Sequence, residues 1–367
     1  MSSGVGPAEQ LDIPWEIIPS GELDEAPHGQ LQEFRQDLQA SQQNELVVVT
    51  PEDFAQEPAT TKAANVQLIR QMHNRVTSGG RHFYVSPDFK WLGESEESHF
   101  SVVRMAGAET SAHGVFFGLL SDEGGAWTLP IAVKPFREKP INVCADWLNN
   151  SLIAGRNQNY FAPVGFMIGG TTNYSITEIR QGAETLDNSH WRRVLMDEHN
   201  PEYDGQRALL AKVGTLIGDL HADSDLDPDH IFHGDLQFKN IVNDVAGNVF
   251  GIDWESASFY NGGASNEVLI NRAAHDLRVL FASMARSEED MGVGLLHNFD
   301  PLTQWRHFKR YVFDPYMEAY LEKSTDAAAF DRLAAVEEHI QDYILQRGLY
   351  TSLKRPRHGR LSTRRTQ

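Results

Sequence analysis

The spacing of hydrophobic and polar residues divides the chain into a strand-rich part followed by a helix-rich part. Between residues 82 and 179, short runs of β-branched and aromatic residues alternate with turn signals, a pattern typical of strands. The predicted strands are 98–106, 114–120, 127–136, 161–168 and 173–177, and a helix is predicted over 140–154. We therefore expect an antiparallel sheet of about five strands together with one helix.

After residue 188, apolar positions recur at intervals of three and four residues, which indicates helices packed on one face. The predicted helices are 206–221, 267–284, 302–322 and 327–352. Two short strands, 240–243 and 249–253, form a hairpin within this part. The expected fold class is therefore α+β, with a β-rich lobe over 61–180, a helical lobe over 181–353 and a ligand cleft between the lobes.

The two ends of the chain differ from the middle in charge. Of the net charge of −19, residues 1–60 contribute −11 and residues 354–367 contribute +6, which leaves −14 for the middle. Six prolines and a single helix-like stretch in 1–60 indicate an acidic, partly disordered extension outside the two lobes. The basic tail 354–367 is a candidate contact for an anionic partner.

The composition also argues against several classes of protein. The excess of acidic side chains argues against extended binding to nucleic acid, which requires a cationic face. The single cysteine, Cys144, cannot form an internal disulfide, and the sequence starts without a basic and apolar leader, so we expect a cytoplasmic protein. The longest uncharged stretch, 157–177, is interrupted by proline and glycine, so it is predicted to form two strands and not a membrane span.

One short segment combines residues that suit phosphoryl transfer. The run from Phe232 to Ile241 reads FHGDLQFKNI, and GIDWE follows at 251–255 after the hairpin. Transfer of a γ-phosphoryl group requires a carboxylate that orients or deprotonates the acceptor hydroxyl, and it requires oxygen ligands for Mg²⁺. Asp235 is the candidate carboxylate. Asn240 and Asp253 are the candidate Mg²⁺ ligands, because hard oxygen donors suit this ion.

The sequence HGDLQFKN followed by IDWE resembles the aminoglycoside phosphotransferase and choline kinase family, which has the protein-kinase-like fold. The segment GDLHA at 218–222 is similar to the end of the helix before that family's catalytic loop, and the resemblance extends over about residues 98–350. It implies a bilobal kinase-like fold with ATP or GTP and Mg²⁺ as cofactors. It also implies transfer of the γ-phosphate to a small-molecule hydroxyl, for example that of an aminated sugar or amino alcohol.

The resemblance also assigns residues of the first lobe to nucleotide binding. Lys134, in the strand segment IAVK, corresponds to the lysine that contacts the α- and β-phosphates. Gly107 and Gly114 flank a candidate flap over the phosphates. Glu178 and Ile179, in the connector between the lobes, are expected to present backbone groups to the nucleotide base.

The partner of this lysine departs from the family pattern. A glutamate from the following helix normally pairs with the lysine, but the predicted helix 140–154 contains no glutamate. Asp146 is the only carboxylate on that helix. Asp146 is therefore the candidate partner of Lys134.

Two other functions agree with parts of the sequence. A protein kinase would share the motifs, but only about ten residues, 254–263, separate Asp253 from the next helix, which is too short for a segment that docks a peptide. A catalytically silent nucleotide-binding scaffold would explain the missing glutamate, but it has no use for Asp235. A calcium loop at 223–234 is rejected, because Pro228 and Gly234 stand where such a loop requires glycine and glutamate.

Overall fold

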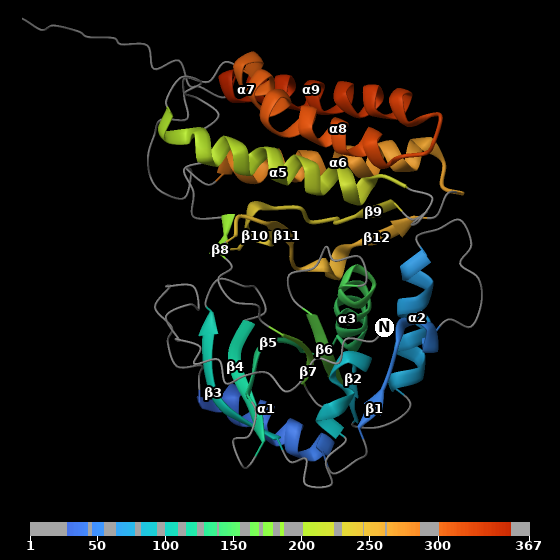
Figure 1. Ribbon diagram of the computed structural model, residues 1–367, viewed down its shortest axis with the longest axis vertical. Helices are drawn as coiled ribbons and strands as arrows, with labels where there is room; N and C mark the ends of the chain where they lie inside the picture. The colour runs from blue at the N-terminus through green and yellow to red at the C-terminus, as the bar shows by residue number, and fades with distance from the viewer. Residues whose placement is uncertain are drawn as a thin grey trace, which may run out of the picture.

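The computed structural model of the protein consists of two lobes stacked along the long axis of the molecule (Figure 1). The N-lobe contains the large sheet with α1, α2 and α3, and the C-lobe contains α5 to α9, with short strands between the two groups. The structure describes residues 28–42, 46–54, 64–77, 82–93, 100–108, 115–122, 128–137, 139–154, 162–168, 172–178, 184–186, 201–223, 230–244, 246–260, 263–286 and 301–353.

The N-lobe sheet has seven strands in the order β1-β2-β6-β7-β5-β4-β3. All neighbouring strands are antiparallel except β1 and β2, which are parallel. The strands are β1 (Val47–Val48), β2 (His82–Val85), β3 (Phe100–Ala108), β4 (Val115–Asp122), β5 (Thr128–Arg137), β6 (Ala162–Ile168) and β7 (Thr172–Glu178). The five predicted strands are therefore confirmed as β3 to β7.

The prediction of a five-stranded antiparallel sheet preceded by an external segment is wrong, because the sheet also contains β1 and β2, which pair in parallel, and because part of the segment packs on the sheet. Strand β1 extends the sheet by pairing with β2, where Val47 lies opposite Tyr84. The helix α1 (His28–Gln42) buries Phe34 and Leu38 in the core of the sheet. The helix-like stretch of the extension thus forms α1, and the apolar residues 46–49 supply β1. Their places on the sheet are set by packing on distant strands, which local patterns do not reveal. Residues 1–27 and 354–367 lie outside the described residues.

We expect the truncation Leu38→Ala to lower the free energy of unfolding by about 2–3 kcal/mol, because it removes a side chain that is 2% exposed at the contact between α1 and the sheet. Urea unfolding would measure the change. The matched control is Gln36→Ala on the exposed side of the same helix, which should change the stability by less than about 0.5 kcal/mol. Equal stabilities of the two variants would show that α1 does not dock on the N-lobe.

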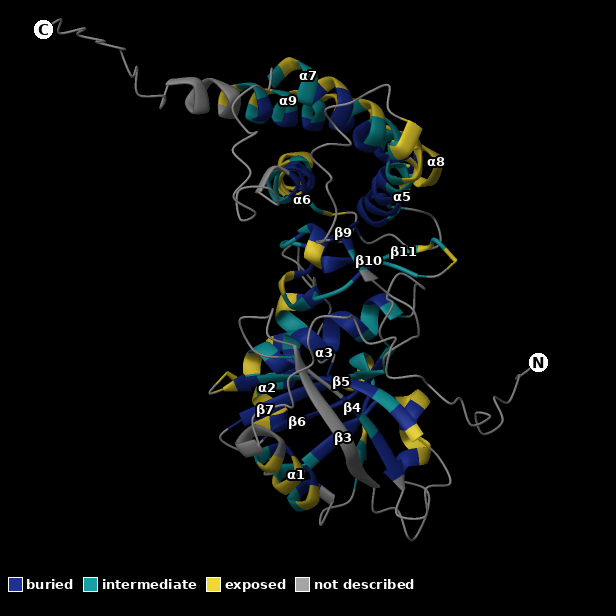
Figure 2. Ribbon diagram, turned by 90° about the vertical axis from the view of Figure 1, so that its left-hand side faces the viewer, coloured by how far each residue is buried: buried dark blue, intermediate teal, exposed yellow. Residues whose placement is uncertain are grey.

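Helices cover both faces of this sheet. On one face, α1 packs on residues such as Phe83, and on the other face α2 (Ala64–Thr77) and α3 (Pro140–Ala154) pack on Tyr84 and Phe166. Successive residues of a strand point to opposite faces, which explains why Phe83 and Tyr84 belong to different cores. Trp147 of α3 lies 5.1 Å from the Phe166 ring. Figure 2 shows the resulting burial of α3 and of the central strands. Two short 3-10 helices, η2 (Pro51–Phe54) and η3 (Pro87–Gly93), complete the described N-lobe.

The C-lobe is a group of packed helices, as the apolar spacing predicts. They are η5 (Pro201–Tyr203), α5 (Asp204–His221), α6 (Asn266–Arg286), α7 (Pro301–Phe308), the π-helical turn η9 (Lys309–Phe313), α8 (Asp314–Lys323) and α9 (Ala329–Leu353). Helix α5 lies so close to α8 that a Cβ added at Gly218 would be 2.4 Å from the Tyr316 carbonyl oxygen. None of the helices in the described residues is both long enough and apolar enough to span a membrane.

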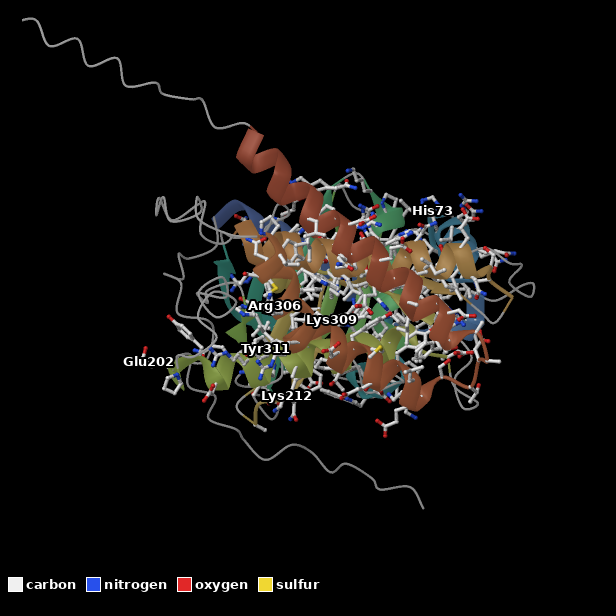
Figure 3. All side chains as sticks on the ribbon, turned by 90° about the horizontal axis from the view of Figure 1, so that it is seen from above. His73, Glu202, Lys212, Arg306, Lys309 and Tyr311 are labelled. Carbon is white, nitrogen blue, oxygen red and sulfur yellow. The ribbon has the colours of Figure 1, made fainter. Side chains whose placement is uncertain are left out.

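The π-helical turn is joined to the last helix by an ion pair. In the view from above, Lys309 lies over the helices of the C-lobe, near Arg306 and Tyr311 (Figure 3). Its Nζ is 2.7 Å from Glu337 Oε1 on α9 and 3.2 Å from Asp314 Oδ1 on α8. These contacts connect α8 and α9 across the turn.

Short strands occupy the region between the large sheet and the helices. They are β8 (Glu184–Thr185), β9 (His230–Phe232), β10 (Ile241–Asn243), β11 (Val249–Gly251) and β12 (Ser258–Tyr260), with 3-10 helices η6 (Phe238–Asn240) and η7 (Trp254–Ser256) beside them. An apolar cluster that includes Ile153 of α3, Leu216 of α5 and Trp254 packs across the boundary of the lobes. The predicted α+β class with two lobes and a hairpin in the second lobe is confirmed.

Candidate active site

The two sequence motifs are brought together by two pairs of short strands. Strand β9 pairs with β12 and β10 pairs with β11, so the link between β9 and β10 lies beside the link between β11 and β12. The first link contains Asp235 and Asn240, and the second contains Asp253. The Ile252 amide donates to the Asn240 carbonyl oxygen at 2.8 Å, which fixes the two links to each other.

Gly234 permits this close approach of the two links. It has a φ of +81°, in the left-handed region that favours glycine. A Cβ at this position would lie 2.4 Å from the Ser256 carbonyl oxygen. The glycine of the HGD sequence is therefore required both by the backbone conformation and by the adjacent backbone.

The buried carboxylate of Asp276, on α6, holds the start of the loop. It accepts the amide protons of His233 at 2.7 Å and of Gly234 at 2.9 Å, and His221 Nε2 donates to it at 3.2 Å. Complete burial opposes ionisation, but the His221 hydrogen bond, the nearby histidines and the Gly234 amide hold the pKa of Asp276 below its ordinary value. Asp276 is thus an ionised acceptor that fixes the residues before Asp235.

Two side-chain amides orient the carboxylate of Asp235. Gln237 Nε2 donates to Oδ1 at 2.6 Å, and Asn240 Nδ2 donates to Oδ2 at 3.3 Å and to the Asp235 carbonyl oxygen at 2.8 Å. The next turn of the loop is fixed because the Phe238 amide donates to the Ser283 hydroxyl on α6 at 3.1 Å. Asp235 is partly exposed, and these hydrogen bonds hold its side chain in a defined orientation.

His233 links the two motifs through the backbone. Its Nε2 donates to the Ile252 carbonyl oxygen at 2.8 Å, and its Nδ1 accepts the Asp235 amide proton at 3.3 Å. Its ring packs on Trp254 at 4.5 Å. Because both ring nitrogens bond to the backbone, His233 has a structural role and leaves the acid–base role to Asp235.

Lys134 of β5 reaches across the lobe boundary to a group of carboxylates. Its Nζ contacts Asp253 Oδ1 directly, lies 3.0 Å from Glu255 Oε2 and lies 3.6 Å from Asp146 Oδ1 on α3. The Lys134 side chain is 15% exposed. The structure therefore brings together Lys134, Asp146 and Asp253 from three separate parts of the chain, and the shorter side chain of Asp146 still reaches the lysine.

The charges of this group influence one another. Burial opposes the charge of Lys134, but Asp146, Asp253 and Glu255 together raise the pKa of the ammonium group above its ordinary value. Burial also opposes ionisation of Asp253, yet the charge and hydrogen bond of Lys134 lower the pKa of that carboxyl. Asp146 is buried more deeply, and this burial raises its pKa because Lys134 offsets only part of the cost. Lys134 thus remains a cation in the site.

The oxygen atoms of the site suit a hard divalent cation. Among the described residues, Asp146, Asp253 and Glu255 have carboxylate oxygens within 4.8 Å of one another. Both hydrogen bonds of the Asn240 side chain use Nδ2, so Oδ1 is the atom that would ligate a cation. Carboxylate and amide oxygens are the donors that Mg²⁺ prefers. The donor set therefore fits the predicted ion.

Of the other predicted nucleotide-binding residues, two lie in the strands of the N-lobe sheet and two lie beyond the described residues. Gly107 lies within β3, opposite Phe116 of β4. Glu178 is the last residue of β7 and lies opposite Ile131. Gly114 and Ile179 lie outside the described residues. The roles of these four positions in nucleotide binding stay predictions.

Two residues of the site had only weak signals in the sequence. Glu255 follows Asp253 by two residues, and the short helix η7 turns it toward Lys134. Asp276 lies on the apolar stripe of α6 with Ala273, Leu277 and Leu280, where an isolated carboxylate is unusual. A carboxylate on such a stripe indicates a buried polar contact, but its partner becomes visible only in the folded chain.

Comparisons with known proteins give a distant likeness. No protein-family model matches the sequence, and no curated protein matches it. Among solved structures, the aminoglycoside phosphotransferase APH(3'')-Id of Streptomyces rimosus in complex with ADP and streptomycin is 14% identical, with a TM-score of 0.31. The alignment covers 70% of this chain and 96% of that chain. A second structure of the same enzyme gives the same identity and coverage, with a TM-score of 0.30.

Proposed function

We propose that the protein transfers the γ-phosphoryl group of ATP or GTP to a hydroxyl group of a small molecule. The observation that carries this proposal is the arrangement of Lys134, Asp253 and Asp235 around the boundary of the lobes. A cation for phosphates, oxygen donors for Mg²⁺ and an oriented carboxylate are the groups that this reaction requires.

Each residue has a distinct role in the proposed reaction. Lys134 would leave its carboxylate partners in part to contact the nucleotide phosphates, whose negative charge would then stabilise the ammonium group in place of the carboxylates. Asn240 and Asp253 would hold Mg²⁺, which when bound neutralises charge on the phosphates. Asp235 would accept a hydrogen bond from the acceptor hydroxyl and take its proton as the phosphoryl group is transferred.

A small molecule is favoured over a protein as the acceptor. The segment after Asp253 is short, Trp254 within it is fully buried, and β12 pairs with β9. This segment is thus used in packing, whereas a protein kinase uses the equivalent segment to dock a peptide. The charge of −14 over residues 61–353 is compatible with a cationic acceptor such as an aminated sugar or amino alcohol.

We expect Lys134→Met to raise the dissociation constant of MgATP by about tenfold to a hundredfold, because a charge-assisted contact to phosphate contributes about 1.5–3 kcal/mol. Isothermal titration calorimetry would measure it. The matched control is Lys139→Met, which removes the same charge from an exposed position and should leave the affinity unchanged.

A screen for phosphate transfer to aminoglycosides, amino alcohols, sugars, nucleosides and a generic protein would then identify the acceptor. A wild-type protein that binds neither MgATP nor MgGTP would contradict the proposed function. Unaltered binding by Lys134→Met would contradict only the role of the lysine. Phosphorylation of the generic protein alone would favour the protein-kinase alternative. Nucleotide binding with no transfer to any acceptor, and no slow hydrolysis, would favour the silent scaffold.

A further inference from the structure

We propose that two buried asparagines, Asn65 of α2 and Asn149 of α3, form an amide clamp that joins the lobes and positions Asp253 relative to Asp146. The proposal rests on the proposed function, because the positioned carboxylates are those assigned to the metal and to Lys134. Both asparagines act through the backbone around Asp253 and are therefore positioning residues.

The clamp is a continuous chain of hydrogen bonds. Asn65 Nδ2 donates to Asn149 Oδ1 at 2.8 Å and to the Ala257 carbonyl oxygen at 2.7 Å, and Asn65 Oδ1 accepts the Phe259 amide proton at 3.2 Å. Asn149 Nδ2 donates to the Trp254 carbonyl oxygen at 2.8 Å. Two N-lobe helices are thereby bonded to both ends of the segment that follows Asp253.

The environment of the clamp makes these bonds effective. Asn65 is 1% exposed and Asn149 is fully buried, so the amides have no access to bulk water. Replacing one of the amides by an apolar side chain would leave the polar atoms of its partners buried without hydrogen bonds, at a cost of about 1–3 kcal/mol for each group. The apolar cluster of Ile153, Trp254 and Phe259 packs beside the same segment. The lobes are therefore held together at the side of the site where α3 meets η7.

The backbone of Asp253 explains why positioning is needed. Asp253 has a φ of 64° and a ψ of 55°, a left-handed conformation that costs an ordinary residue about 1–2 kcal/mol and persists only where the surroundings hold it. On its N-terminal side, the Ile252 amide is bonded to the Asn240 carbonyl oxygen. On its C-terminal side, the carbonyl group of Trp254 is bonded to Asn149. The clamp thus supplies the restraint on the C-terminal side, and the Asn240 carbonyl oxygen and His233, which bond to the two backbone groups of Ile252, supply restraints on the N-terminal side.

The clamp also sets the distance between the two carboxylates that face Lys134. Asp146 and Asn149 are one helical turn apart on α3, so a helix that is fixed through Asn149 carries Asp146 with it. In many kinases a modifiable loop controls the position of this helix. In this protein, buried amides in the described structure hold the helix against η7, so the geometry of the site needs no separate activating event.

We test the clamp with Asn149→Leu and Asn65→Leu, which keep the approximate size of the side chain and remove its hydrogen bonds. The matched control is Asn150→Leu, a neighbouring buried asparagine that donates to the Asp146 carbonyl oxygen within α3 at 2.7 Å. Calorimetry would measure the dissociation constant of ADP with and without Mg²⁺. We expect both clamp variants to weaken binding in the presence of Mg²⁺ by about tenfold to a hundredfold, as is usual for groups that orient metal ligands, and to change Mg²⁺-free binding much less.

The ratio of the ADP affinity with Mg²⁺ to the ADP affinity without Mg²⁺ distinguishes a positioning role from general destabilisation. Asn150→Leu should lose stability and keep the wild-type ratio. In the double variant Asn65→Leu/Asn149→Leu, ADP binding with Mg²⁺ should be no weaker than in the more affected single variant, because the amides act as one unit. Hydrogen exchange should also become faster over residues 254–260 in the clamp variants.

A wild-type ratio in Asn149→Leu, or an equal change in the control, would overturn the proposal. A wild-type protein that does not bind ADP at all would instead contradict the proposed function. In that case, hydrogen exchange would still test whether the asparagines hold residues 254–260. Unaltered protection of these residues in both clamp variants would overturn the proposal.

Discussion

Replacing Asp235 by asparagine is expected to lower phosphoryl transfer by about a thousandfold, with little change in the affinity for MgATP. The substitution preserves the shape of the side chain and its bond from Gln237 Nε2, and Asn240 Nδ2 still donates to the backbone carbonyl oxygen of residue 235, so the loop keeps its conformation. It removes the proton acceptor, and general-base catalysis contributes about 10²–10⁴-fold to such reactions. An interaction that forms only in the transition state affects kcat and kcat/KM equally. Before the acceptor is known, the rate of slow ATP hydrolysis by the wild type and by Asp235→Asn would measure this loss of turnover.

Two controls in the same loop distinguish the roles of its residues. Lys239→Ala removes an exposed side chain between Asp235 and Asn240, and it should leave turnover near that of the wild type. Gln237→Ala removes a donor to the Asp235 carboxylate and should have an intermediate effect, because the Asn240 contact at 3.3 Å continues to orient the carboxylate. Turnover by Asp235→Asn equal to that of the wild type would contradict the assignment of Asp235 as the base.

The parts of the fold that could be predicted from the sequence are those whose signals are local. The strands β3 to β7 and helix α5 have clear apolar spacing, and the hairpin that separates Asn240 from Asp253 is marked by its turn. The chemistry of the HGD and IDWE motifs depends on residue types a few positions apart, so Asp235, Asn240 and Asp253 could be selected before the fold was known.

The parts that could not be predicted depend on contacts between distant segments. The helix-like stretch that forms α1 is visible in the sequence, but its docking on the sheet and the pairing of β1 depend on strands that lie much later in the chain. Asn65 and Asn149 carry no local signal, because an asparagine in a helix is more often exposed than buried. Asp146 could be identified as the only carboxylate of its helix, but only the folded chain places it 3.6 Å from Lys134.

We expect Asp276→Ala to lower the free energy of unfolding by about 3–5 kcal/mol, because each donor left without its acceptor costs about 1–3 kcal/mol. The carboxylate is 0% exposed and accepts hydrogen bonds from the amides of His233 and Gly234 and from the His221 ring. Its removal leaves three buried donors without acceptors at the start of the catalytic loop. Urea unfolding at neutral pH would measure the loss. Asp219→Asn, which breaks an exposed ion pair with Lys323, should cost less than about 1 kcal/mol and serves as the control.

The lowered pKa of Asp276 also predicts how the free energy of unfolding depends on pH in the acidic range. The pKa of Asp276 is lower in the folded protein than the ordinary value of about 3.9 expected in the unfolded chain. The unfolded chain therefore binds the proton first as the pH falls. The stabilisation by this carboxylate is complete above about pH 4 and is lost as the pH falls through the lower, folded pKa. In Asp276→Asn the side chain does not titrate, so its loss of stability relative to wild type should shrink as the pH falls from about 4 through the folded pKa. A difference that stayed constant over this range would show that the interaction of Asp276 with the loop does not depend on its charge.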